Sequence, residues 1–168
     1  MAVKDDRFFP GGQKAGASRT GWRLFASPVP DGVHVWVSHI DDEAAQDGLD
    51  ILQLQAQVEW RLAAAGIPVR HQEESPDRPQ AAPCLGVLLH LRRTAAAPSD
   101  YIFSVEVFFV RAIIQEDEPA TRGLHLSWCQ EALGSVPMTP QGPDWSAVFS
   151  HVHLLVEDFI SSFQAAQP

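Results

Sequence analysis

Alternating apolar and polar positions predict the first regular element of the chain, a strand over Val33–Ile40. The three valines of this segment share one face, whereas His34 and Trp36 point to the other face. Three acidic residues follow at positions 41–43. Acidic side chains are favoured at the start of a helix, so we expect a helix to begin directly after the strand.

Apolar residues then recur at helical spacing and predict one long helix over residues 44–65. Gly66 suits the end of this helix because glycine accepts a left-handed backbone conformation, and Pro68 prevents continuation. The predicted buried face consists of Ile51, Leu54, Val58, Leu62 and Ala65.

Period-two patterns return after the helix. They predict a short strand at residues 67–70 and three longer strands at residues 85–94, 101–115 and 123–130. Consecutive strands with short connections are typical of an antiparallel meander. A second helix is predicted to begin near Asp144, with a continuous apolar stripe of Trp145, Val148, Phe149, Val152, Leu155, Val156, Phe159 and Phe163.

These elements predict an α+β protein built as a two-layer sandwich, in the order β-α-(β)-β-β-β-α. We expect a mostly antiparallel sheet of four to five strands with two long helices on one face. Residues 32–168 are expected to form this single domain, preceded by a disordered or loosely docked lead at residues 1–31. An apolar patch of Trp22, Leu24 and Phe25 in the lead is a candidate for docking on the domain.

The charge balance excludes some classes of partner. The chain has 12 Lys and Arg against 21 Asp and Glu, a formal net charge of −9, and its cations are scattered. We therefore expect neither nucleic-acid binding nor attachment to an anionic membrane surface. We also predict no transmembrane segment and no signal peptide, because no apolar run is long enough. The expected location is the cytoplasm, with the periplasm or envelope as the alternative if a leader is missing.

Two cysteines, Cys84 and Cys129, leave two interpretations open. They are either small, buried apolar side chains or a single disulfide formed in an oxidising compartment. They do not form a CxxC pair and so do not indicate a zinc site.

No pattern in the sequence predicts a catalytic residue, a metal site or a cofactor. His151 and His153 point in different directions on a helix, and His34 and His39 lie on opposite faces of a strand. No nucleophile elbow and no phosphate-binding glycine loop is present.

Four residues are candidates for a binding surface. Trp36 and His34 form a patch for a partner if the helices leave their face of the strand uncovered. Ser104 and Glu106 lie on the mixed face of the strand predicted at residues 101–115. We expect Glu106 to face solvent; if it were buried, its raised pKa would suit a general base.

The layout resembles a family of small bacterial domains of unknown function. The resemblance covers residues 32–165 and is carried by Val33–Val37, Gly66 with its neighbours, Leu126-Ser127-Trp128 and the closing Val156–Ile160. In outline, it is similar to the amino-terminal domain of the Tol-Pal translocation protein, a mixed sheet with two helices on one side. The resemblance implies an interaction domain of the bacterial envelope; none of its motifs is a catalytic signature.

The sequence therefore predicts a non-enzymatic protein-interaction module that contacts a protein partner or a second copy of itself. The contact is expected at a sheet edge or on an uncovered sheet face. The alternative is a small-molecule-binding domain or minor enzyme with a pocket between sheet and helices, lined by Tyr101, Phe103 and Glu106.

Overall fold

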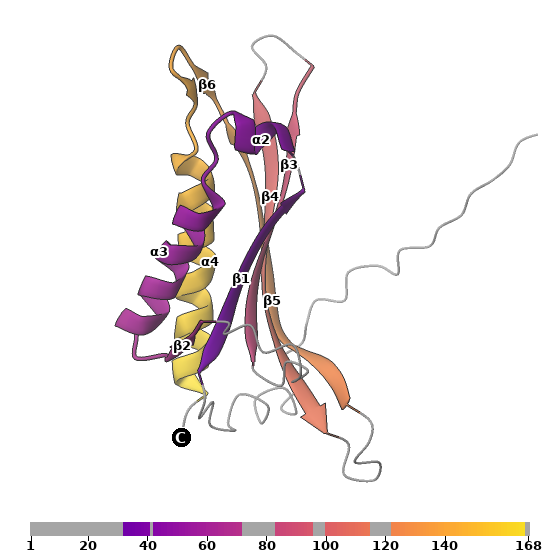
Figure 1. Ribbon diagram of the computed structural model, residues 1–168, viewed down its shortest axis with the longest axis vertical. Coiled ribbons are helices and arrows are strands. Elements are labelled where there is room, and N and C mark those ends of the chain that lie inside the picture. Colours follow the sequence, from indigo (N-terminus) through magenta and orange to yellow (C-terminus); the bar gives the residue numbers. More distant parts are fainter. Residues whose placement is uncertain (1–31, 41, 72–82, 96–99, 115–121, 167–168) are drawn as a thin grey trace, which may run out of the picture.

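A five-stranded mixed sheet and two long helices form the two layers of the protein (Figure 1). The computed structural model describes residues 32–40, 42–71, 83–95, 100–114 and 122–166. The predicted lead at residues 1–31 lies outside the described residues. The α+β class and the two-layer arrangement are confirmed, with a third, short helix in addition to the two that were predicted.

The strands follow the order β2-β1-β3-β4-β5 across the sheet. β1 (Val33–Ile40) runs parallel to both β2 (Val69–Arg70) and β3 (Cys84–Arg93). β3, β4 (Tyr101–Ile114) and β5 (Arg122–Val136) form the predicted antiparallel meander. The return from β1 to its parallel neighbour β3 passes through α3, as parallel pairing requires a crossover connection.

The prediction of one continuous helix over residues 44–65 is wrong. The chain forms a short α2 (Asp42–Gln46), turns, and starts again as α3 (Ile51–Ala64). Gly48 takes a φ of +94° in the turn, and the side chain of Asp50 accepts a hydrogen bond of 2.9 Å from the Gln53 backbone N–H. A left-handed glycine followed by a helix-capping aspartate ends one helix and begins another.

The turn between α2 and α3 is fixed to both layers through Asp47. The Tyr101 hydroxyl donates a 2.6 Å hydrogen bond to the Asp47 carboxylate, and the Trp145 indole N–H donates one of 3.1 Å to the Asp47 carbonyl. The break in the helix therefore places polar groups of the turn over the start of β4 and the start of α4 (Ser146–Ala165).

β5 extends six residues beyond the predicted end at residue 130. After β5 the chain forms a small hairpin of β6 (Met138–Thr139) and β7 (Gly142–Pro143). Gly134 weakens the strand pattern in the sequence, but its missing side chain makes room for the ring of Phe103, its register partner on β4. Close approach of an aromatic ring is a common reason for glycine within a strand.

One continuous core joins the two layers. The predicted helical faces are confirmed: Leu54, Val58 and Leu62 of α3 are fully buried. The predicted stripe on α4 packs on β4 and β5, and the ring of Phe159 lies between those of Phe109 and Trp128, at centroid distances of 5.1 and 5.4 Å. No polar or charged residue is buried among those described.

Candidate interaction surface

The sheet has two faces with different cover. α3 packs on β1, α4 packs on β4 and β5, and both helices lie on the face that carries the three valines of β1. Over the described part of the chain, no helix or strand lies on the other face (Figure 1). We call this other face the open face; it consists of the even-numbered positions of β1, β3 and β4 and the β5 positions paired with them.

The structure places the four predicted site residues together on the open face. His34 and Trp36 come from β1, and Ser104 and Glu106 come from β4. β3 separates the two pairs, so the two strands lie about 10 Å apart. The four side chains share one face of the sheet.

Two aromatic residues bridge the open face across β3. Gly86 is the register partner of both Trp36 on β1 and Phe108 on β4. A Cβ atom at Gly86 would overlap the ring of Phe108, which lies over the glycine. The ring of Trp36 is 6.4 Å from that of Phe108, at an interplanar angle of 59°, and Trp36 remains 44% exposed.

Three further aliphatic side chains are exposed on the open face. Leu126 and Ile102 are each 55% exposed, and Leu133 is 72% exposed. Sequence reasoning missed these three residues and Phe108. Parity was the available signal, because all four occupy strand positions opposite to the buried ones.

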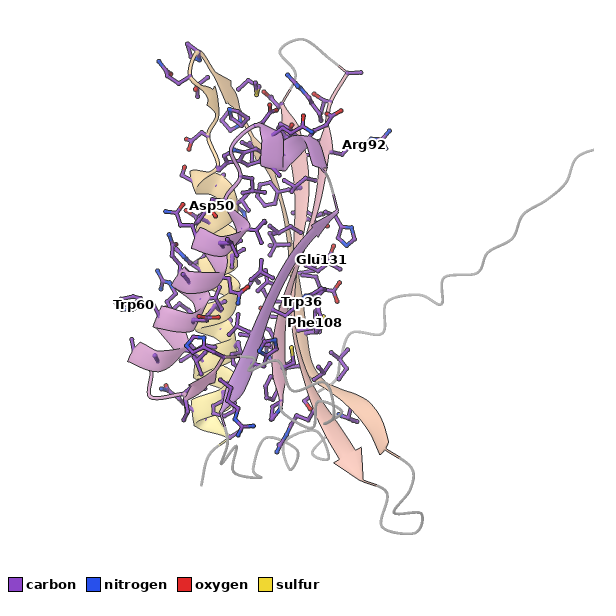
Figure 2. The ribbon with its side chains drawn as sticks, in the orientation of Figure 1. Trp36, Asp50, Trp60, Arg92, Phe108 and Glu131 are labelled. Carbon is purple, nitrogen blue, oxygen red and sulfur yellow. The ribbon has the colours of Figure 1, made fainter. Side chains whose placement is uncertain are left out.

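An acidic pair lies within the same surface. Glu106 of β4 and Glu131 of β5 are register partners, so two carboxylates stand directly opposite each other. Like charges in this position disfavour the pairing of the strands. Within the described residues, no Lys, Arg or His forms an ion pair with either carboxylate. Figure 2 shows Trp36, Phe108 and Glu131 on the side of the sheet away from α3.

Cys129 connects the acidic pair to the aromatic pair. Its thiol donates a 3.3 Å hydrogen bond to Glu106 Oε1, and its register partner on β4 is Phe108. Partial burial, together with the hydrogen bond to Glu106 and the charges of Glu106 and Glu131, raises the pKa of the Cys129 thiol to about 11. The thiol is therefore kept protonated at neutral pH and is a poor nucleophile.

The two cysteines are both free, which contradicts the disulfide interpretation. They are on β3 and β5, with β4 between them. The alternative of two buried apolar side chains is also wrong for Cys129, which is exposed at the sheet edge, while Cys84 is half-buried.

The pocket considered as an alternative site is not formed by its predicted residues. Tyr101 and Phe103 are buried in the core, and Glu106 points to the open face. Odd and even positions of a strand face opposite sides of the sheet, so these residues cannot line one cavity.

The histidines on α4 have separate surroundings. The Nδ1–H of His151 donates a 2.8 Å hydrogen bond to the Ala147 carbonyl, because a carbonyl oxygen can only accept, and the ring packs edge-on against Phe103. His153 has its Nε2 shielded from solvent, with no hydrogen-bond partner in the described part of the chain. Shielding, and then the charge of Arg61, lowers the pKa of His153. Among the described residues no three His, Cys, Asp or Glu side chains are grouped to hold a metal ion.

Comparison with known proteins gives similar solved structures. No family model and no curated protein matches the chain. A minor lipoprotein from Acinetobacter baumannii is 14% identical, over 79% of this chain and 91% of its own, with a TM-score of 0.29. The rare lipoprotein B from Shewanella oneidensis is 16% identical, over 79% of this chain and 87% of its own, with a TM-score of 0.26.

These comparisons do not show the predicted similarity to the Tol-Pal protein domain, which stays a prediction. The cellular location also stays a prediction, with the cytoplasm and the envelope as the two alternatives. Of the described helices, none combines the length and the apolar character that a membrane crossing requires.

Proposed function

We propose that the chain is a non-enzymatic protein-interaction module and that the open face of its sheet is the contact surface. The observation that carries the proposal is the aromatic pair of Trp36 and Phe108, with exposed Leu126 and Leu133 on the same face of the sheet. Single exposed apolar side chains are ordinary, but a group of them on one uncovered sheet face is typical of an interface.

The chemistry of this surface favours a partner segment with both apolar and cationic side chains. Tryptophan at the centre of an apolar patch is a frequent source of binding energy in protein interfaces. Glu106 and Glu131 favour a cation between them, because it would relieve the repulsion of two opposed carboxylates. An arginine meets both requirements, since its guanidinium binds carboxylates in a bidentate manner and stacks on aromatic rings.

Site-specific photo-crosslinking in cells of the source organism tests the proposal. Leu133 on the open face and Leu52 on the outer side of α3 form a matched pair, 72% and 78% exposed. Each is replaced in turn by benzoylphenylalanine. We expect the Leu133 position to cross-link to one protein that the Leu52 position does not reach. Equal cross-linking from both positions, or from Leu52 alone, would refute the open face as the interface.

A second pair of variants then tests the energetics with the identified partner in purified form. Trp36→Ala removes one ring of the aromatic pair on the open face, whereas Trp60→Ala removes an equally large ring on α3, 68% exposed. We expect Trp36→Ala to weaken binding at least about tenfold in calorimetry, and Trp60→Ala to leave it unchanged. If the cross-linked protein is a second copy of the chain, light scattering of the same two variants gives the readout instead.

A further inference from the structure

The open face matches, in chemistry and in reach, a short segment of the same chain. Residues 22–25 read Trp-Arg-Leu-Phe, which is three large apolar side chains around one cation. The open face offers an aromatic pair and exposed leucines around two opposed carboxylates. Each kind of group on the segment therefore has a complementary group on the surface.

We infer that residues 22–25 dock on the open face of their own chain, with Arg23 beside Glu106 and Glu131, so that a partner must displace them. Only the competition between residues 22–25 and a partner rests on the proposed function. Docking of the segment itself is independent of any partner.

The length of the connection permits this docking. Seven residues lie between Phe25 and Val33, the first residue of β1. Eight Cα–Cα steps reach at most roughly 26–29 Å when extended. The open face from β1 to β5 is three strand spacings wide, or about 14 Å. Residues 22–25 can therefore reach every strand of the open face without a change in β1.

The charge distribution favours the same contact. Residues 1–31 contain five of the 12 cationic residues of the chain but only three of its 21 acidic residues. The rest of the chain is strongly acidic, and its described part supplies no cation to Glu106 or Glu131. A cationic segment at one end of an acidic chain is attracted to the domain, and most strongly where carboxylates are unpaired.

The tether makes even a weak contact effective. A connection of this length gives a local concentration of roughly millimolar, so an affinity of that order is enough to keep the segment docked. A partner that binds the same surface then competes with the segment. The apparent association constant of the partner is its intrinsic value multiplied by the fraction of chains in which the surface is free.

Paramagnetic relaxation in the full-length chain measures the docking directly. A nitroxide is attached to a cysteine introduced by Thr20→Cys, with Cys84 and Cys129 replaced by serine. The five tryptophans provide five indole N–H signals. Trp36 and Trp60 lie on opposite sides of the molecule (Figure 2). We expect the Trp36 signal to broaden and the Trp60 signal to stay sharp.

Two controls decide what causes the broadening. Trp22→Ser with Phe25→Ser in the labelled chain should restore the Trp36 signal, whereas Phe8→Ser with Phe9→Ser should not. A second sample tests for contact between molecules. In it, one copy of the chain carries the nitroxide at natural isotopic abundance, and the other copy is isotope-labelled and carries no nitroxide. An unbroadened Trp36, equal broadening of Trp60, or broadening that appears only between molecules would overturn the inference; the last outcome identifies a second copy as the occupant.

A partner assay keeps this inference distinct from the proposed function. If both hold, Trp22→Ser with Phe25→Ser binds the cross-linked partner about tenfold more tightly than the unsubstituted chain. If cross-linking from Leu133 finds a partner but Trp36 is not broadened, the interaction module stands and the docking fails. If Trp36 is broadened but no partner is found at Leu133, the docking stands and the proposed function fails.

Discussion

Gly86 and Phe108 face each other on neighbouring strands, and the ring of Phe108 occupies the space that a Cβ atom at Gly86 would need. Gly134 has the same relationship with Phe103 on the opposite face of the sheet. The two glycines differ in what surrounds the ring: Phe108 lies on the open face, whereas Phe103 is buried in the core.

This difference predicts unequal costs for two identical substitutions. Gly134→Ala should lower the free energy of unfolding by about 1–3 kcal/mol, because the ring of Phe103 cannot move within a packed core. Gly86→Ala should cost less, because Phe108 can rotate towards solvent, and it should alter the fluorescence of the adjacent Trp36. Urea unfolding and emission spectra measure both effects. A larger loss for Gly86→Ala would contradict the assignment of the two faces.

Val58 tests the buried face of α3. The side chain is fully buried between α3 and the sheet, and Val58→Asp should lower the free energy of unfolding by more than about 3 kcal/mol because a carboxylate has no partner there. Leu52→Asp, on the exposed side of the same helix, should change it by less than about 0.5 kcal/mol. Thermal unfolding distinguishes the two variants; an unchanged melting temperature for Val58→Asp would contradict the packing of α3.

His153 should make stability fall in acid. Its pKa is lowered in the folded protein by shielding and by Arg61, so the unfolded chain takes up the proton at a higher pH than the folded chain. The contribution of neutral His153 is therefore complete above the ordinary pKa of 6.5 and is lost as pH falls below it. His153→Gln should show a smaller decrease in the urea midpoint between pH 7.5 and pH 5.5 than the unsubstituted protein. Equal decreases would show that this histidine does not contribute.

Cys129 should react slowly although it is exposed. With a pKa of about 11, only about one thiol in a thousand is ionised at pH 8, against roughly a quarter for an ordinary cysteine. Alkylation by iodoacetamide, followed by mass spectrometry, should therefore be much slower in the folded protein than in urea. Glu106→Gln should accelerate the reaction, because it removes one of the charges that raise the pKa. Equal rates in the folded and unfolded chains would contradict the raised pKa.

Two residues of the sequence indicate the break between α2 and α3, but the helical spacing of the apolar residues does not. The apolar face of residues 51–65 is regular, and it favoured an unbroken helix from residue 44. Gly48 and Asp50 were the local signals for a break, and they became decisive because Asp47 between the two helices bonds to Tyr101 and Trp145. Those contacts join residues far apart in the chain, so the local pattern does not contain them.

The sequence by itself determined which side chains share a face, because parity in a strand and spacing in a helix are local properties of the chain. Parity therefore predicts that Trp36 lies on the other face of its strand from the buried valines, and that Glu106 lies on the other face of its strand from Phe103. Only the tertiary structure decided that β1 pairs in parallel with β3, which brings Trp36 beside Phe108 over Gly86, and that Glu131 stands against Glu106. Register between strands is set by packing of the whole sheet against its helices, and this depends on contacts between distant segments.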